Sequence, residues 1–173
     1  MDRFTSSLRS SVAHGDWYAA LTLALTLPDI CGKIDAPALG SQARYARWFE
    51  DWLAHHYRKE IGHYKREHTF MSGDDLYALR CSYLHQGDAE LSGKAQKVRN
   101  ALDSFVFIQP REGLAIHNGQ IGRKLALQVS IFCEQMADAV DAWYSARGGE
   151  QHIADAVSKL LNIQEINEWI IEL

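Results

Sequence analysis

The chain has few of the features that mark several large classes of protein. Its three cysteines, Cys31, Cys81 and Cys133, are an odd number, lie far apart and form no CxxC pair, which argues against a zinc finger and indicates reduced thiols. Its longest apolar run, Trp17 to Leu27, has eleven residues and contains threonines, so it falls short of the ~20 residues that cross a bilayer. The formal net charge of −4 argues against a protein that coats DNA or RNA through an overall positive charge. It does not exclude a local basic cleft.

What the chain does have is enough apolar residues for a core. With 47% hydrophobic residues in a length of 173, it can bury that core without disulfides or metal. No internal repeat, linker or low-complexity tract divides the sequence, so a single domain over residues 1–173 is predicted. Asp2 and Asp16 precede the apolar run and no small-x-small cleavage pattern follows it, which argues against a secretory signal and predicts a cytoplasmic protein that binds no membrane.

Two helices are predicted near the start of the chain. Residues 2–13 repeat apolar side chains at a spacing of four and end at a Gly-Asp break. Asp16 is placed to cap a second helix, residues 17–27, which is apolar nearly all round and belongs in the core. Pro28 is expected to end that helix at Leu27, because proline disfavours the αR conformation of the residue before it.

Two further helices are predicted after a connector at 32–40. Ser41 is the expected N-cap of a helix with a broad apolar stripe. Further on, Ser72 and Asp75 match a capping box that starts another helix. Its apolar side chains at i, i+3 and i+7 face the core until Gly87 stops it.

The second half of the chain is predicted to hold one hairpin and the longest helix. Residues 104–118 pair two short β-rich runs around Pro110 to Gly113, the only strand signal in the sequence. Apolar residues at steps of three or four then predict a helix from about Gly122 to Arg147, and residues 150–173 one or two short amphipathic helices. The simplest fold that contains these elements is mainly all-α: a helical bundle with one small β-hairpin.

The candidate chemistry lies on the helix that the capping box starts. The string from Arg80 to His85 fits R-x4-H, a spacing in which an arginine and a histidine can cleave RNA without metal. Spacing alone decides nothing, because four other Arg/His pairs in the chain fit R-x(4 to 6)-H. Context separates them, since Arg80 and His85 lie inside a capped helix between apolar residues, next to a core where an unpaired charge is costly.

Two explanations of that placement stay open. In the structural one, Arg80 pairs with Asp75 or another carboxylate, and His85 caps the helix C-terminus, where the dipole favours a cation. In the functional one, both side chains serve one site. Five residues turn an ideal helix by about 500°, which leaves the two side chains about 140° apart. They therefore meet only if Arg80 reaches around or a two-fold partner closes a composite cleft.

The stretch Asp74-Asp-Leu-Tyr-Ala-Leu-Arg-Cys-Ser-Tyr-Leu-His-Gln-Gly87 resembles the motif helix of the HEPN superfamily. Members of that superfamily are all-helical domains that dimerise and often act as RNA-cleaving toxins or defence nucleases. The residue after the motif arginine is typically Asn, Asp or His in the family, and Cys81 stands there in this chain.

The resemblance implies a homodimeric, metal-independent endoribonuclease without a cofactor, in which Arg80 and His85 are catalytic. A histidine that titrates near neutral pH suits removal of the 2′-OH proton, and a guanidinium suits the phosphate as the oxygen attacks. The expected product carries a 2′,3′-cyclic phosphate. Ser82 is a further candidate to position the phosphate; its alternative is a helix hydroxyl bonded to the backbone. An antitoxin or another regulatory protein is a possible partner.

The segment 55–68 is the most cationic of the chain, and RNA contacts are expected from Arg58, Lys59, Lys65 and Arg66. The alternative is a solvated surface of mixed charge, since the net charge of the segment is only +2. Its histidines match no standard ligand array, so no metal site is predicted. The rival function is a non-catalytic protein- or nucleotide-binding dimerisation module, in which Arg80 holds the dimer or an anionic ligand.

Overall fold

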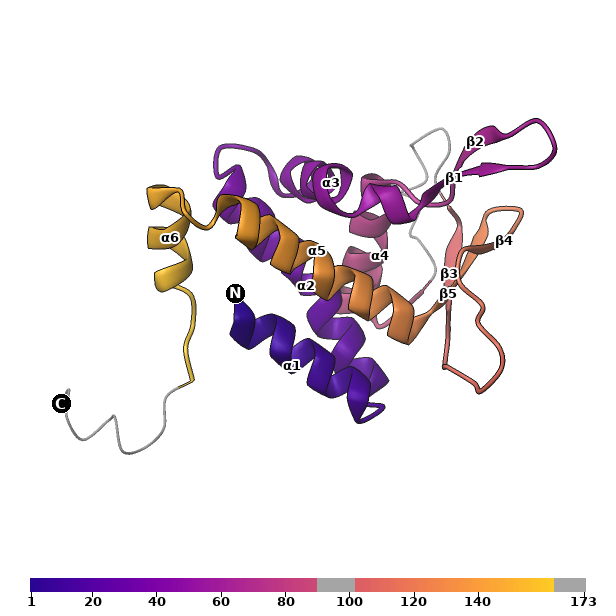
Figure 1. Cartoon of the computed structure of the whole chain (residues 1–173), viewed down its shortest axis with the longest axis horizontal. Helices are drawn as coiled ribbons and strands as arrows, with labels where there is room; N and C mark the ends of the chain where they lie inside the picture. Colours follow the sequence, from indigo (N-terminus) through magenta and orange to yellow (C-terminus); the bar gives the residue numbers. More distant parts are fainter. Residues whose placement is uncertain (90–101, 164–173) are drawn as a thin grey trace.

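A long helix, α5, runs through the middle of the molecule, with two small sheets at one end and a short helix at the other (Figure 1). The computed structural model describes residues 1–89 and 102–163. The helices are α1 (Asp2–Ala13), α2 (Trp17–Asp35), α3 (Ser41–Trp52), the 3-10 turn η1 (Ala54–His56), α4 (Gly73–Gln86), α5 (Val129–Arg147) and α6 (Gln151–Ser158). The strands are β1 (Arg58–Ile61), β2 (Arg66–Thr69), β3 (Ser104–Ile108), β4 (Gly119–Ile121) and β5 (Lys124–Gln128). The mainly helical fold is confirmed, but there is more strand than one hairpin.

Helix α5 supplies the centre of the core. Its side chains Phe132, Met136, Val140 and Trp143 follow one another at steps of three or four, and all are 0% exposed. They form one apolar stripe, as expected for a helix with this period. The helix packs with α1, α2 and α3. The stripe predicted from the sequence is thus confirmed from Val129 onward.

Helix α2 does not end before Pro28, as predicted, but continues through it to Asp35. Proline has no N–H to donate, so one carbonyl of the preceding turn loses its helical partner. The tertiary structure adds a bond nearby, since the buried Tyr45 of α3 donates its hydroxyl to the carbonyl of Leu25 at 3.0 Å. As a result, Asp29 lies within a packed helix and not at the end of one.

The caps of α2 and α3 agree with the sequence only in part. Asp16 is the N-cap of α2, as predicted, but its side chain makes no capping hydrogen bond. Gly40, and not Ser41, is the N-cap of α3. Ser41 is the first helical residue, and its Oγ lies 3.4 Å from Oδ1 of Asp29.

The hairpin predicted at 104–118 is wrong. Strand β3 pairs in parallel with β5, and β4 pairs antiparallel with the other side of β5. Strand β5 also replaces the start of the predicted long helix, so α5 begins at Val129. Leu125 and Leu127 explain the difference, because they are both 0% exposed and so present one buried face with the period of a strand, although Leu125 and Val129 also fit a helical spacing.

A second sheet lies where no strand was predicted. Strands β1 and β2 form an antiparallel hairpin that projects from the helices (Figure 1), with Arg58 opposite Thr69. All of its strand residues except His68 are exposed, so no apolar alternation marks these strands in the sequence. The N–H of Phe70 donates to the carbonyl of Tyr57 at 2.8 Å and closes the base of the hairpin.

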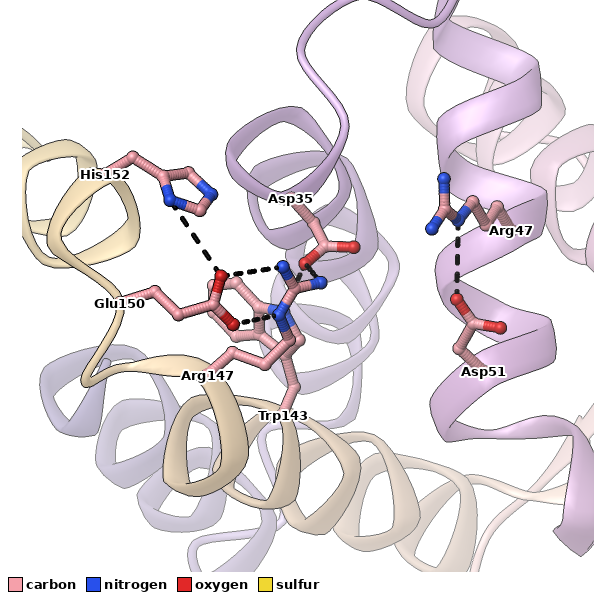
Figure 2. A network of polar contacts seen from close by, with 7 residues as sticks. All are labelled: Asp35, Arg47, Asp51, Trp143, Arg147, Glu150 and His152. Atoms are coloured by element: carbon pink, nitrogen blue, oxygen red, sulfur yellow. Dashed lines mark hydrogen bonds and ion pairs between the residues drawn. The ribbon is translucent and has the colours of Figure 1, made fainter.

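A polar network joins the ends of α2 and α5 to the start of α6 (Figure 2). The carboxylate of Asp35 accepts from Trp143 Nε1 at 3.2 Å and from Arg147 Nη1 at 2.5 Å. Arg147 also donates through Nε to Glu150 at 2.7 Å, and this bond lowers the pKa of Glu150. The network therefore fixes where α6 leaves α5.

Helix α6 is one of the short helices predicted for 150–173. The part of that prediction beyond residue 163 lies outside the described residues. Across 1–89 and 102–163, no helix combines the length and the apolar character needed to cross a membrane.

Candidate functional site

Local sequence sets both ends of α4, the helix that carries the candidate residues. Ser72 Oγ accepts from the N–H of Asp75 at 3.2 Å, while the N–H of Ser72 donates to the Asp75 carboxylate at 2.9 Å. This is the predicted capping box. Gly87 ends the helix with a φ of +69°, a left-handed conformation that costs glycine no Cβ clash. The predicted limits of this helix are confirmed.

Neighbouring helices hold α4 from both sides. A Cβ on Gly73 would lie 2.6 Å from the carbonyl oxygen and 2.7 Å from the Cα of Ala46, so the start of α4 can approach α3 this closely because the residue is glycine. Near the other end, the hydroxyl of Tyr83 lies 3.3 Å from Thr22 Oγ1 and 3.4 Å from the carbonyl of Tyr18. The position of α4 is thus set by α3 at one end and α2 at the other.

Arg80 and His85 meet on α4. Nη1 of Arg80 lies 3.4 Å from Nε2 of His85, which is exposed. The arginine side chain is long enough to bridge the angle between the two positions, so the contact forms within one chain and needs no second subunit. Because a guanidinium can only donate, Nε2 of His85 accepts and the imidazole proton lies on Nδ1.

The same guanidinium is paired with a carboxylate of α2. Nε of Arg80 lies 2.6 Å from Oδ2 of Asp29, and the two side chains are 22% and 14% exposed. Both atoms are buried and neither makes a well-aligned hydrogen bond, so each relies on the charge of the other. Burial lowers the pKa of Arg80, but Asp29 and the sulfur of Cys81 raise it by more. Arg80, His85 and Asp29 together are called the α4 site below.

The sequence missed Asp29 as a site residue. The structural explanation of Arg80 named Asp75 or another carboxylate, but Asp75 is occupied by the capping box and by the N–H of Leu102 at 2.8 Å. Because the helix was expected to end before Pro28, Asp29 was expected to lie outside it. The spacing offers a signal only once α2 is known to be continuous. Thr22 and Asp29 are seven residues apart and so share one face of α2, and Thr22 contacts Tyr83 of α4.

The two residues that follow Arg80 in the motif, Cys81 and Ser82, differ in their surroundings. Ser82, the candidate phosphate contact, is 4% exposed, so the structure places it in the interior and does not bring it to the surface beside His85. Cys81 is partly exposed, and its Sγ lies 4.0 Å from Nη1 of Arg80. The residue that departs from the family pattern is therefore in weak contact with the candidate arginine.

The four basic candidates all lie on the β1–β2 hairpin: Arg58, Lys59, Lys65 and Arg66. Arg58 is paired with Glu50 of α3, and the other three are exposed. In the part of the chain that the structure describes, no hydrogen bond or ion pair joins the hairpin to the α4 site. The contacts of the described residues thus do not bring the two groups of predicted residues together.

The surface beside the hairpin has mixed charge. A hollow of about 520 Å³ lies between α3, η1 and the hairpin, and it is lined by Glu50, Asp51, Ala54, His55, Arg58, Lys59, Glu60 and Glu67. Four carboxylates and two basic side chains face it, and Glu60 lies directly opposite Glu67 in the hairpin. This balance is unfavourable for a row of phosphates, which bind where positive charge prevails.

No group of three or more His, Cys, Asp or Glu side chains within 1–89 and 102–163 is arranged to hold a metal ion. Comparison of the chain with models of protein families, with curated proteins and with solved structures finds no match. The function is therefore argued from the geometry of the α4 site.

Proposed function

We propose that this protein is a metal-independent endoribonuclease and that the α4 site is its active site. The observation that carries the proposal is the approach of Arg80 Nη1 to His85 Nε2, 3.4 Å apart on the same helix, with His85 exposed. Together these side chains supply a phosphate-binding group and a proton-transfer group. The HEPN-like sequence of α4 supports the same activity.

In this proposal Arg80 binds the scissile phosphate. Its Nη donors leave His85 for the charged phosphate oxygens, which are the stronger acceptors, and the Nε2 lone pair of His85 then takes the proton of the 2′-OH. The 2′-oxygen forms a bond to phosphorus as the bond from phosphorus to the 5′-oxygen breaks. The leaving 5′-oxygen takes up a proton from water, and His85 returns its proton to the solvent. The products are a 2′,3′-cyclic phosphate and a 5′-hydroxyl, and DNA is resistant because it lacks the 2′-OH.

Asp29 acts here as a positioning residue. Its contact at Nε of Arg80 leaves the two Nη groups available, and the planar guanidinium then presents them in a fixed direction. Removing Asp29 is expected to weaken phosphate binding without removing the group that transfers the proton.

A second function is favoured by the Arg80–Asp29 pair itself. A guanidinium that is partly buried and neutralised by a carboxylate can serve the packing of α4 on α2 alone. The protein is then a non-catalytic protein- or nucleotide-binding dimerisation module. The two functions differ in whether His85 is needed for a chemical step.

The experiment that separates them is cleavage of a labelled RNA pool in EDTA. We expect cleavage by the wild type, cyclic-phosphate ends on the products, and loss of cleavage in His85→Ala. The matched control is His14→Ala, which removes an exposed histidine at the end of α1 and should cleave like the wild type. Circular dichroism checks that all three proteins are folded. A folded wild type that leaves the RNA intact would contradict the nuclease and favour the binding module.

RNA contacts from the hairpin are part of the proposal and need a separate test. In the His85→Ala background, changing Arg58, Lys59, Lys65 and Arg66 to serine should weaken RNA binding and reduce its salt dependence, by about 0.7 in the log–log slope for each lost contact with a single strand. Serines at the exposed Lys33 and Lys159 are the control for lost charge. An unchanged slope in the hairpin variant would assign the mixed-charge surface no part in binding.

A homodimer, a cytoplasmic location, and a role as a toxin or phage-defence effector held in check by an antitoxin complete the proposal, and the resemblance of α4 alone suggests them. Sedimentation equilibrium over a range of concentrations tests the first of these. A monomer mass at every concentration would remove the dimer, and the contact within one chain between Arg80 and His85 would then be the whole site.

A further inference from the structure

A strap of four residues, 117–120, connects the base of the β1–β2 hairpin to α5. On the α5 side, Nε2 of His117 lies 3.2 Å from Oε1 of Gln135. On the hairpin side, Asn118 Nδ2 donates to the carbonyl of His56 at 2.9 Å, and Oε1 of Gln120 lies 2.7 Å from Nε2 of His68. These side-chain contacts link the strap to segments far away in the sequence.

The hydrogen bonds define the protonation of His117. Oε1 of Gln135 also accepts the hydroxyl of Tyr57 at 2.9 Å, and an amide oxygen has no proton to donate. Nε2 of His117 therefore carries the proton, and Nδ1 of the neutral ring carries a lone pair. That Nδ1 is buried and has no hydrogen-bond partner among the described residues. A second proton, placed on Nδ1, would be a buried donor without an acceptor.

The backbone of the strap also adopts an uncommon conformation at one residue. Asn118 has a φ of +57°, a left-handed conformation that is uncommon outside glycine although asparagine tolerates it. The residue is 9% exposed, and its Oδ1 is a second buried acceptor without a partner among the described residues. The strap therefore depends on the few side-chain hydrogen bonds given above, and its two buried acceptors add none among the described residues.

Burial and the neighbouring groups oppose protonation of His117 and His56. Burial lowers the pKa of His117, the bond to Gln135 raises it, and Lys59 and His56 lower it further. Burial and the neighbouring His55 likewise lower the pKa of His56, and Lys59 adds to this. The groups that act on the two rings thus come from η1 (His55, His56), β1 (Lys59) and α5 (Gln135, Asp138).

The carboxylate of α5 does not reverse this balance. Asp138 raises the pKa of His56, but by less than burial and His55 lower it. Its Oδ1 already accepts from Arg9 Nη2 at 2.6 Å. Positive charge on His56 and His117 would therefore face Lys59 with little compensation.

We propose that the strap is a pH-sensitive latch, which holds the base of the β1–β2 hairpin to α5 while His117 is neutral and releases it when the buried Nδ1 of His117 takes up a proton. In the released form the ring of His117 reaches solvent and regains an ordinary pKa near 6.5. The latched form thus binds fewer protons, so its stability relative to the released form is full above about pH 6.5 and decreases as the pH falls below that value. The latch concerns the attachment of the hairpin and does not depend on the proposed nuclease activity.

Hydrogen exchange of the full chain, followed by mass spectrometry at about pH 7.5 and about pH 5.5, tests the latch. Labelling times are scaled for the intrinsic pH dependence of amide exchange, and peptides from α1 and α3 serve as internal references. Exchange in residues 58–69 and 111–121 should rise at the lower pH, by up to about tenfold per pH unit as His117 protonates. Equal protection at both values of pH would overturn the proposal.

Two variants assign the effect. His117→Gln has a neutral side chain with an N–H at every pH, so the rise in exchange should be largely lost. His14→Gln, which changes an exposed histidine at the end of α1, should behave like the wild type. A full rise in His117→Gln would exclude His117 as the trigger.

A titration of the wild type gives the same answer without a substitution. The ring resonance of His117, followed by NMR, should titrate below about pH 6.5, together with the amide shifts of the hairpin. A His117 that titrates with no change in the hairpin amides would refute the latch.

Discussion

Nε of Arg80 on α4 lies 2.6 Å from Oδ2 of Asp29 on α2. Since α2 continues through Pro28, Asp29 is held by a packed helix, and the guanidinium is engaged from two sides, by Asp29 at Nε and by His85 at Nη1. The orientation of the candidate arginine thus depends on a residue from another helix, whichever function the α4 site performs.

Replacing Asp29 with asparagine should destabilise the protein and loosen Arg80. The substitution keeps the shape of the side chain and removes its charge, so the Arg80 guanidinium keeps its burial and loses its counter-charge. We expect the free energy of unfolding to fall by about 1–3 kcal/mol, less than the ~3–5 kcal/mol of a fully buried pair because both side chains retain some exposure. Urea unfolding followed by circular dichroism measures the change.

The control for that substitution is Asp51→Asn, which breaks the exposed Arg47–Asp51 pair on α3 (Figure 2). Exposed pairs four residues apart in a helix contribute about 0.3–0.5 kcal/mol. Equal losses in the two variants would show that the Asp29 pair contributes no more than a surface contact.

Asp35→Ala should be a costly change at the end of α2, where that helix packs on α5. The side chain of Asp35 is 4% exposed and accepts from Trp143 Nε1 and Arg147 Nη1, so its loss leaves the indole N–H of a fully buried tryptophan without an acceptor. We expect a loss of about 2–4 kcal/mol, which corresponds to a fall in Tm of several degrees for a domain of this size. Thermal unfolding of Asp35→Ala beside Asp51→Ala, which removes an exposed carboxylate, provides the comparison; similar Tm values would exclude a stabilising role for the network in Figure 2.

Gly73→Ala should force α4 away from α3. The added Cβ would meet the backbone of Ala46 at 2.6 Å, and backbone cannot turn aside as a side chain can. Overpacking of this kind costs about 1–3 kcal/mol, and the displaced helix should also lower any activity of the α4 site. Gly149→Ala is the control, because a Cβ added there would meet no described atom within 4 Å beyond its chain neighbours, and its cost should stay within about 0.5 kcal/mol. A Gly73 variant as stable as this control would contradict the close approach of the two helices.

The three thiols should react in a defined order. Burial raises the pKa of Cys133 to about 12 and that of Cys31 well above the ordinary value, so at about pH 8 the thiolate of Cys133 is near one part in ten thousand. Cys81 is partly exposed, so iodoacetamide should label it first, as peptide mass spectrometry would show. In denaturing urea all three should react alike. Early labelling of Cys31 or Cys133 in the folded protein would contradict the packing of α2 or α5.

Much of the helical framework was predictable from the sequence, including the helix that carries Arg80 and His85. The capping box at Ser72 and the glycine at 87 gave the limits of α4, and the spacing of Phe132, Met136 and Val140 gave the buried face of α5. The strands were harder. The β1–β2 hairpin is exposed and so shows no apolar alternation, and the parallel pairing of β3 with β5 joins segments that a local reading placed in a hairpin and a helix.

The sequence singled out Arg80 and His85, but it indicated neither the contact between them nor Asp29. Helical geometry placed Arg80 and His85 about 140° apart, and the observed approach depends on the rotamer of a long side chain held by Asp29. The strap had no sequence signal, because its hydrogen bonds connect residues 117–120 with η1, β2 and α5.

The sequence by itself determined those elements whose signals lie within a few residues of one another: the capped α4, the helix α1 and the apolar stripe of α5. Only the tertiary structure decided whether α2 passes through Pro28, which carboxylate faces Arg80, and how the hairpin is attached. The physical reason is that these outcomes depend on the free energy of contacts between residues distant in the chain, where packing and charge outweigh local preference.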